Sequence, residues 1–177
     1  MIFDDLRVQG CYRIQTEPRI DERGWFARTY CAEEFGNHDI DFRIVQSSVS
    51  KNTARGTLRG MHYQRLPSRE CKLVRCGRGA LYDVMIDLRR DSPTYLQWDA
   101  VELTEDNGQM VYITAGCAHG FLTLEDNTQV VYQMNEIYSS LLFAGVRWND
   151  PAFAIQWPEI RPLVISDRDR SFPDYRE

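Results

Sequence analysis

The chain has 177 residues, a mass of 20.7 kDa, a formal net charge of -5 and an isoelectric point near 5.3. This length suits one domain with a single core, and the acidic balance argues against a nucleic-acid-binding protein, which needs a basic face. The sequence contains no long apolar run and no leader pattern, so we expect a soluble, cytoplasmic protein that does not enter a membrane. The five cysteines include no C-x-x-C pair, which indicates reduced thiols.

Short segments that alternate apolar and polar residues recur along the chain and predict strands. A turn at Asp21–Gly24 separates the first two, and one helical turn at Ala32–Phe35 stops before Asn37. The predicted strands are Leu6–Ile14, Trp25–Tyr30, Phe42–Gln46, Gly56–Gln64, Cys71–Cys76, Ala80–Leu88, Gln97–Leu103, Met110–Ile113 and Gln129–Met134. Many short strands separated by turn residues indicate a sandwich or closed barrel. The tail from Trp148 onward is predicted as loop with at most one short helix.

The stretch Gly56–Gln64 combines a cation, an imidazole and a phenol in a strand-forming context. In a regular strand Arg59 and His62 face opposite sides. Both can reach one ligand only if a bulge or twist at Gly60 re-aims one of them. Lys72 follows as a lone cation in the next apolar strand. A histidine, an arginine and a lysine on adjacent strands would suit an anionic ligand that must lose a proton.

The chain has three histidines, and they differ in context. His38 lies in a predicted exposed turn and is expected to have no role. His62 and His119 lie in apolar strands with flanking glycines, which let the backbone approach a ligand closely. Each is a candidate functional group or a buried structural histidine. Neither has a second histidine two residues away, so we expect no metal site.

Two tyrosines and one aspartate complete the set of candidates. Tyr132 closes an apolar strand and Tyr138 follows it; either could simply pack with its hydroxyl at the surface. A phenol opposite an imidazole would instead be an acid facing a base. Asp169 lies in a charged tail, where most aspartates are exposed.

Taken together, these segments resemble the nucleotide-sugar 4-keto-hexose 3,5-epimerases, the dTDP-4-dehydrorhamnose 3,5-epimerase-like family, over nearly the whole chain. The ordered motifs that carry the resemblance are Asp21–Phe26, Gly56–Gln64, Lys72–Arg75, Tyr82–Arg89, Ser92–Tyr95, Ala118–Phe121 and Trp148–Pro151. The resemblance implies an all-β, cupin-type jelly-roll β-barrel with short peripheral helices. It also implies a single domain over 1–177, with a core at 51–140 and a tail at 141–177. A homodimer that exchanges strands within 1–50 is expected, with no metal or organic cofactor.

The resemblance further implies roles in proton transfer beside a ketone. At the matching positions His62 is the base, Asp169 orients its ring, Lys72 holds the developing oxyanion, and Tyr132 delivers a proton to the opposite face.

The remaining matched positions imply contacts with the substrate. Arg59 fits the diphosphate, and His119 has a supporting role in the same pocket. Arg23, Phe26, Gln46 and Tyr138 match positions around the nucleotide. Arg28 stands where an acidic residue is common, Ser48 where Asn is common, and Gln133, Cys71 and Cys117 also depart from the pattern. These departures leave dTDP, CDP and GDP open as the carrier.

The implied function is inversion at C3, C5 or both of a nucleotide-diphospho-4-keto-6-deoxyhexose, for deoxysugar and surface polysaccharide (lipopolysaccharide O-antigen) synthesis. The alternatives are a monoepimerase acting on a CDP- or GDP-linked sugar, a 3,4-ketoisomerase, and a non-catalytic sugar-nucleotide-binding cupin.

Overall fold

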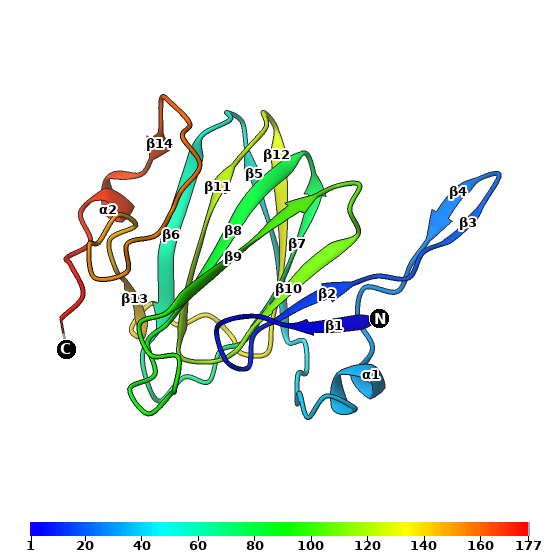
Figure 1. Ribbon diagram of the computed structural model, residues 1–177, viewed down its shortest axis with the longest axis horizontal. Coiled ribbons are helices and arrows are strands. Elements are labelled where there is room, and N and C mark those ends of the chain that lie inside the picture. The colour runs from blue at the N-terminus through cyan, green and yellow to red at the C-terminus, as the bar shows by residue number, and fades with distance from the viewer. Residues whose placement is uncertain (177) are drawn as a thin grey trace.

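Two antiparallel β-sheets face one another and enclose the core in a computed structural model that describes residues 1–176 (Figure 1). The first sheet contains, in spatial order, β1 (Ile2–Asp5), β2 (Tyr12–Gln15), β10 (Gln109–Ile113), β7 (Lys72–Arg78), β12 (Thr128–Met134) and β5 (Gln46–Asn52). The second contains β13 (Phe143–Gly145), β6 (Thr57–Gln64), β11 (Cys117–Thr123), β8 (Ala80–Asp87) and β9 (Trp98–Thr104), and β14 (Val164–Ile165) pairs in parallel with β6. This architecture confirms the predicted jelly-roll barrel.

Alternate residues of both sheets point inward and form the core. The largest cluster of buried side chains includes Val74, Leu81, Met85, Val111 and Phe121. Burial of one such side chain contributes about 1.5–3 kcal/mol. The two sheets are therefore held together by the apolar side chains of their facing surfaces.

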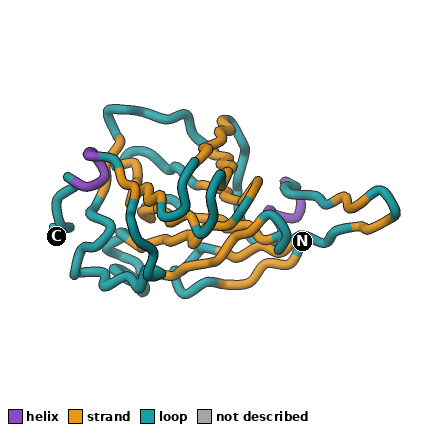
Figure 2. The backbone as a smooth tube through the Cα atoms, turned by 90° about the horizontal axis from the view of Figure 1, so that it is seen from above, coloured by secondary structure: helices purple, strands orange, loops and turns teal. Residues whose placement is uncertain are grey.

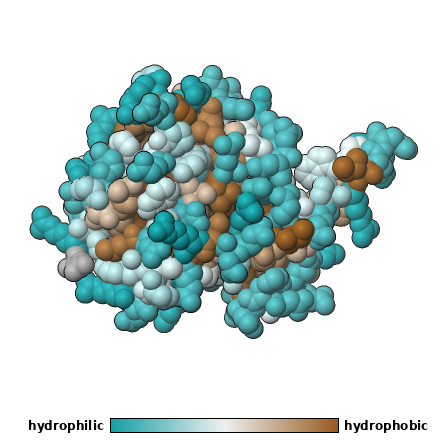
Figure 3. Space-filling view, in the orientation of Figure 1, coloured by the Kyte–Doolittle hydropathy of each residue, from teal (hydrophilic) through white to brown (hydrophobic). Residues whose placement is uncertain are grey.

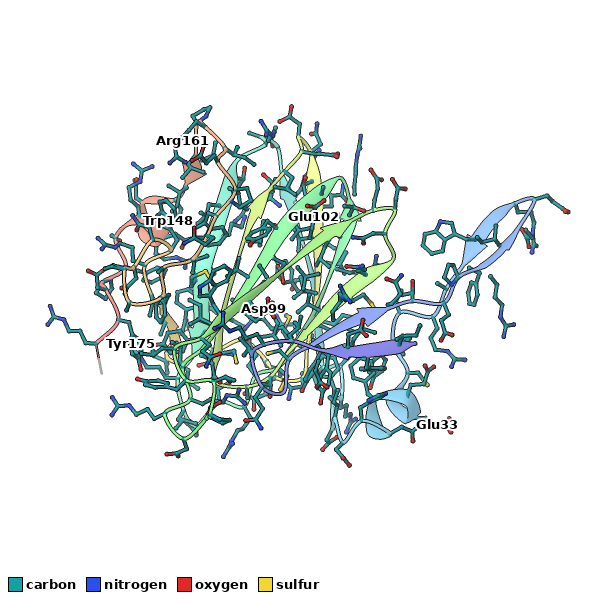
Figure 4. The ribbon with its side chains drawn as sticks, viewed as in Figure 1. Glu33, Asp99, Glu102, Trp148, Arg161 and Tyr175 are labelled. Atoms are coloured by element: carbon teal, nitrogen blue, oxygen red, sulfur yellow. The ribbon has the colours of Figure 1, made fainter. Side chains whose placement is uncertain are left out.

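The C-terminal tail covers the outer face of the second sheet, beside β6 (Figure 1). Phe153 and Trp157 pack against Met61 and Val84 there. The tail ends in the short helix α2 (Asp167–Arg170). The side-chain view shows Trp148 and Tyr175 on the same side of the barrel (Figure 4). The tail was predicted as loop with one short helix, and β14 is an addition that the sequence pattern did not indicate.

An N-terminal hairpin of β3 (Arg19–Asp21) and β4 (Gly24–Phe26), here called the arm, projects away from the barrel (Figures 1 and 2). Its apolar side chains are exposed, as the brown patch on the projecting segment shows (Figure 3). The helix α1 (Ala32–Gly36) follows the arm, as predicted, and buries Phe35 against the first sheet. Neither helix within residues 1–176 is long and apolar enough to cross a membrane.

Three predicted strands were placed wrongly near the N-terminus. The segment Leu6–Ile14 is not one strand, because the chain reverses at Gly10, whose φ is +77°, and Leu6 N–H donates to the Cys11 carbonyl. The predicted strand Trp25–Tyr30 stops at Phe26. Phe42–Gln46 alternates buried and exposed residues but has no strand partner before Val45, whose N–H donates to the Met134 carbonyl.

Candidate active site

A bulge in β6 brings Arg59 and His62 onto one face. His62 lies opposite His119 on β11, whereas Arg59 lies opposite Phe121, so β6 holds one more residue than β11 between the two pairs. Directly opposed residues share a face of the sheet, and Phe121 belongs to the core. Arg59, His62 and His119 therefore all face the barrel interior. The condition stated from the sequence, a bulge or twist at Gly60, is met by this register shift.

Glycines permit this bulge because the two strands approach closely there. A Cβ on Gly60 would lie 2.5 Å from the Cα of Gly120, and one on Gly120 would lie 2.5 Å from the Met61 Sδ. Gly60 also has φ +132°, a conformation that favours glycine. The glycine beside His119 thus serves contact between strands, whereas the sequence had indicated contact between backbone and ligand.

His62 is paired with a buried carboxylate from the tail. Ser166 caps α2 by accepting a hydrogen bond from the Asp169 N–H at 3.1 Å, which turns Asp169 toward β6. Asp169 is only 3% exposed, contrary to the general expectation for an aspartate in a charged tail. Its Oδ1 lies 2.8 Å from the His62 Nε2, and its Oδ2 accepts the Gly60 N–H at 3.1 Å. One carboxylate therefore fixes both the bulge and the imidazole.

The charge state of Asp169 follows from these contacts. Burial alone would raise its pKa, but the hydrogen bond and charge of His62, together with the Gly60 N–H, outweigh it and hold the pKa below its usual value. Asp169 is thus a carboxylate at neutral pH. Because Nε2 of His62 is engaged by Asp169, Nδ1 is the ring nitrogen that can take a proton from a substrate.

Aromatic rings pack around the His62 imidazole. The ring centroids of Phe143 and Phe172 lie 5.2 Å and 5.8 Å from it. The guanidinium carbon of Arg168 lies 4.6 Å from the centroid of Phe143, on the edge of this group. These rings make one side of the histidine apolar and restrict its contact with water.

A second imidazole–carboxylate pair lies deeper in the same sheet. The His119 Nε2 is 2.7 Å from the Asp83 Oδ1, and both side chains are buried. The buried Oδ2 of Asp83 has no hydrogen-bond partner within residues 1–176. The ring of Tyr132 meets His119 edge-on, with centroids 6.1 Å apart. Burial and the charge of Asp83 raise the pKa of the Tyr132 phenol, so it remains protonated at neutral pH.

The facing sheet supplies Tyr132 and Lys72. Tyr132 pairs with Val74 on β7, and Lys72 pairs with Ile113 on β10. Val74 and Ile113 are core residues, so both functional side chains share their inward face. The Lys72 Nζ lies 2.6 Å from a carboxylate oxygen of Glu70. His62 and Tyr132 thus reach the interior from opposite walls.

Gln46 and Ser48 lie on β5, opposite Met134 and Tyr132, and therefore share this inward-facing side. The Gln46 Oε1 accepts the Tyr138 N–H at 2.9 Å, which places Tyr138 at the rim of the same wall. On the opposite sheet, the Nε of Arg59 donates to Asn52 at 2.8 Å.

The structure does not bring three predicted substrate-binding residues into this barrel. Arg23 is exposed on the arm and pairs with Asp21, and Phe26 is 75% exposed. Arg28 pairs with Glu34 at 2.8 Å. Phe26 and Arg28 line a surface cavity at the base of the arm instead.

Several residues of the site were missed in the sequence. Asp83 falls inside the Tyr82–Arg89 motif, and its position between Leu81 and Met85 places a lone acid on the inward face of an apolar strand. Glu70 lies two residues before Lys72, so a carboxylate beside the lone cation was a usable signal. Phe172 carried no local signal, because only folding of the tail brings it to His62.

A metal site was expected to be absent. Within residues 1–176, no group of three or more His, Cys, Asp and Glu side chains is placed to hold a metal ion. The arrangement can transfer protons, because it combines an imidazole paired with a carboxylate, a protonated phenol on the facing wall and the amino group of Lys72 on that same wall.

Known proteins are similar to this chain in both sequence and fold. The family model for dTDP-4-dehydrorhamnose 3,5-epimerase matches residues 5–177. The dTDP-4-dehydrorhamnose 3,5-epimerase of Sinorhizobium fredii is 38% identical, covering 100% of this chain and 91% of that protein. The crystal structure of the Bacillus anthracis enzyme with TDP and PPi bound has a TM-score of 0.93 and 36% identity, covering 98% of this chain and 99% of the other.

A related activity is also represented among the structural neighbours. ChmJ, a 3'-monoepimerase from Streptomyces bikiniensis solved with dTDP-quinovose, has a TM-score of 0.89 and 33% identity, covering 96% of this chain and 85% of that chain. The protein is an epimerase, and the chain belongs to the dTDP-4-dehydrorhamnose 3,5-epimerase family.

Proposed function

We propose that the protein inverts C3 and C5 of a nucleotide-diphospho-4-keto-6-deoxyhexose. The observation that supports this most directly is the placement of the His62–Asp169 pair and Tyr132 on opposite walls of one interior. Inversion requires a base on one face of the sugar ring and an acid on the other. A protein that only binds a sugar nucleotide does not need a base and an acid on opposite sides of the ligand.

The chemistry follows from the ketone at C4. It acidifies the neighbouring C–H bonds, and Nδ1 of His62 removes the proton while Asp169 stabilises the imidazolium that forms. The electron pair moves to O4, where the Lys72 ammonium stabilises the enolate. Tyr132 then donates its proton to the other face of the carbon. This last step returns the enolate to a ketone and leaves an imidazolium and a phenolate, which recover their starting forms by proton exchange with solvent.

The substrate is held by groups at the open end of the barrel. Arg59 binds the diphosphate, since a guanidinium matches phosphate oxygens. His119 supports the sugar, and Tyr138, Gln46 and Ser48 surround the nucleoside. The likeness to ChmJ keeps inversion at C3 alone as the second candidate. Arg28 stands at a position where acidic residues are common in the family. The experiment therefore compares sugars carried on different nucleotides.

The arm gives a reason to propose a homodimer. Ile20, Trp25 and Phe26 are 79%, 65% and 75% exposed on a hairpin that leaves its own barrel. Val49 on the edge strand β5 is 62% exposed as well. A second copy that receives the arm would bury these apolar side chains. The arm would then carry Arg23 and Phe26 to the partner's nucleotide, with Arg28 at its base.

The test is a proton NMR time course in deuterated water with 4-keto-6-deoxyglucose carried on dTDP, CDP or GDP. Loss of the C3 and C5 signals with inversion at both carbons is the expected result, and loss at one carbon identifies a monoepimerase. His62→Ala should stop exchange at both carbons while the nucleotide still binds. Binding without exchange by the unaltered protein, with every carrier, would overturn the proposal.

A further inference from the structure

The ammonium group of Lys72 is held by a carboxylate that belongs to a larger hydrogen-bonded network. Glu70 Oε2 lies 2.6 Å from Nζ, and the two side chains are 8% and 15% exposed. Lysine has three donor hydrogens, so Glu70 occupies one and leaves two for the interior. A buried ammonium without its partner is strongly unfavourable, and a free lysine side chain has many rotamers. Glu70 therefore selects one direction for Nζ.

Glu70 is itself fixed from two sides. Its Oε1 accepts a hydrogen bond from the Gln64 amide at 3.1 Å, and its own N–H donates to the Ser68 Oγ at 3.2 Å. Gln64 also accepts the Ser139 N–H through Oε1 at 3.1 Å. Gln64 is thus a rigid link between the Lys72 ion pair and the segment that carries Tyr138.

A second carboxylate stabilises the same turn without touching the lysine. Glu136 accepts hydrogen bonds from Ser68 Oγ at 2.6 Å and from the Arg69 N–H at 2.9 Å. Two carboxylates therefore lie at this turn: Glu70 belongs to it, and Glu136 accepts hydrogen bonds from it. Of these, the structure pairs only Glu70 with a residue of the proton-transfer site.

We propose that Glu70 is a positioning residue for catalysis, which orients the Lys72 ammonium toward the oxyanion that forms at the substrate ketone. This inference rests on the proposed function, because it assigns the oxyanion to Lys72. Glu70 does not touch the substrate. Its effect on the rate passes entirely through Lys72, and this separates it from a residue that merely stabilises the fold.

The experiment is a double-mutant cycle on the turnover of the nucleotide sugar. Glu70→Ala alone should lower kcat about tenfold or more, with little change in the Kd for the nucleotide diphosphate. Glu70→Gln should recover part of this loss, since its amide oxygen can still accept from Nζ. In a Lys72→Ala background, Glu70→Ala should change the remaining rate less than about twofold.

Glu136→Gln is the matched control, and it should keep kcat within about twofold even if it lowers the melting temperature. Equal losses from Glu70→Ala in the two backgrounds would overturn the inference, as would an unchanged kcat in Glu70→Ala. A failure of the proposed function is distinguishable, because the unaltered protein would then show no exchange with any carrier. In that case the melting temperatures of the single and double variants are compared. Additive effects of Glu70→Ala and Lys72→Ala would then overturn the pairing of the two side chains.

Discussion

One extra residue in β6 determines which side chains can act together. Without the bulge, Arg59 and His62 would lie on opposite faces of the sheet, and the contacts proposed for them with diphosphate and sugar could not belong to one ligand. The carboxylate of Asp169 accepts the Gly60 N–H and also bonds to His62. The geometry of the base therefore depends on a glycine that has no functional group of its own.

At the same scale, the proposed base His62 and the proposed acid Tyr132 lie on opposite walls of the barrel, so their tasks can be separated by mutation. Tyr132→Phe should retain deuterium exchange at C3 and C5, because His62 can still remove the proton and return a deuteron to the same face. Inversion should fall on the order of 100-fold, since the donor on the other face is lost. Both rates come from one NMR time course.

Tyr82→Phe is the control for this prediction. Tyr82 also carries a partly buried phenol with a raised pKa, but it packs against Trp157 outside the barrel. Tyr82→Phe should leave the rates of deuterium exchange and inversion unchanged. Parallel loss of exchange and inversion in Tyr132→Phe would instead indicate a packing role for the ring.

Among the elements, the four-residue helix α2 supplies the carboxylate that bonds to Gly60 and His62 of β6. Its cap, Ser166, directs Asp169 toward β6, where the carboxylate has a lowered pKa. A lowered pKa in the folded state stabilises the fold above the unfolded value of about 3.9, and this contribution is lost as the pH falls through the folded pKa.

Asp169→Asn should therefore cost about 1.5–3 kcal/mol of unfolding free energy at pH 7, and clearly less near pH 3. Urea titrations of both proteins at the two pH values measure this difference. Asp167→Asn, at an exposed position in the same helix, is the control and should show little effect. An equal cost at both pH values would contradict a role for the ionised carboxylate.

The sequence predicted the central strands well, because alternation of apolar residues reports burial directly. Strands such as β8 and β12 begin and end within about a residue of their predicted bounds. The same pattern failed at Phe42–Gln46, where alternate residues are buried against α1 and the first sheet but no neighbouring strand offers hydrogen bonds until Val45. Periodicity detects an inward face, whereas a strand also needs a partner.

Across the whole molecule, the site joins residues that no local pattern connects. His62 and Asp169 are 107 positions apart, and the general preference of aspartate for the surface indicated the wrong environment. Only the resemblance to a family placed Asp169 beside the histidine. By contrast, a bulge or twist at Gly60 was the condition, stated from the sequence alone, for Arg59 and His62 to reach one ligand, and the strand register shows such an irregularity there.

The arm leads to a prediction about the assembly. If the arm of one copy completes the site of another, the protein should be a dimer by light scattering. Trp25→Ser should weaken that dimer, because burial of one large apolar side chain contributes about 1.5–3 kcal/mol. Leu141→Ser is the control. It changes an apolar residue that is 88% exposed and lies outside the arm, and it should leave the dimer unchanged.

Complementation tests the shared site itself. An Arg23→Ala/Phe26→Ala variant and a His62→Ala variant should each be nearly inactive. In a mixed dimer, the barrel with intact His62 receives the intact arm of its partner, while the other site lacks both. Random reassociation of equal amounts should therefore restore about a quarter of the sites. Inactive mixtures that still contain mixed dimers would show that each arm serves its own barrel, or none.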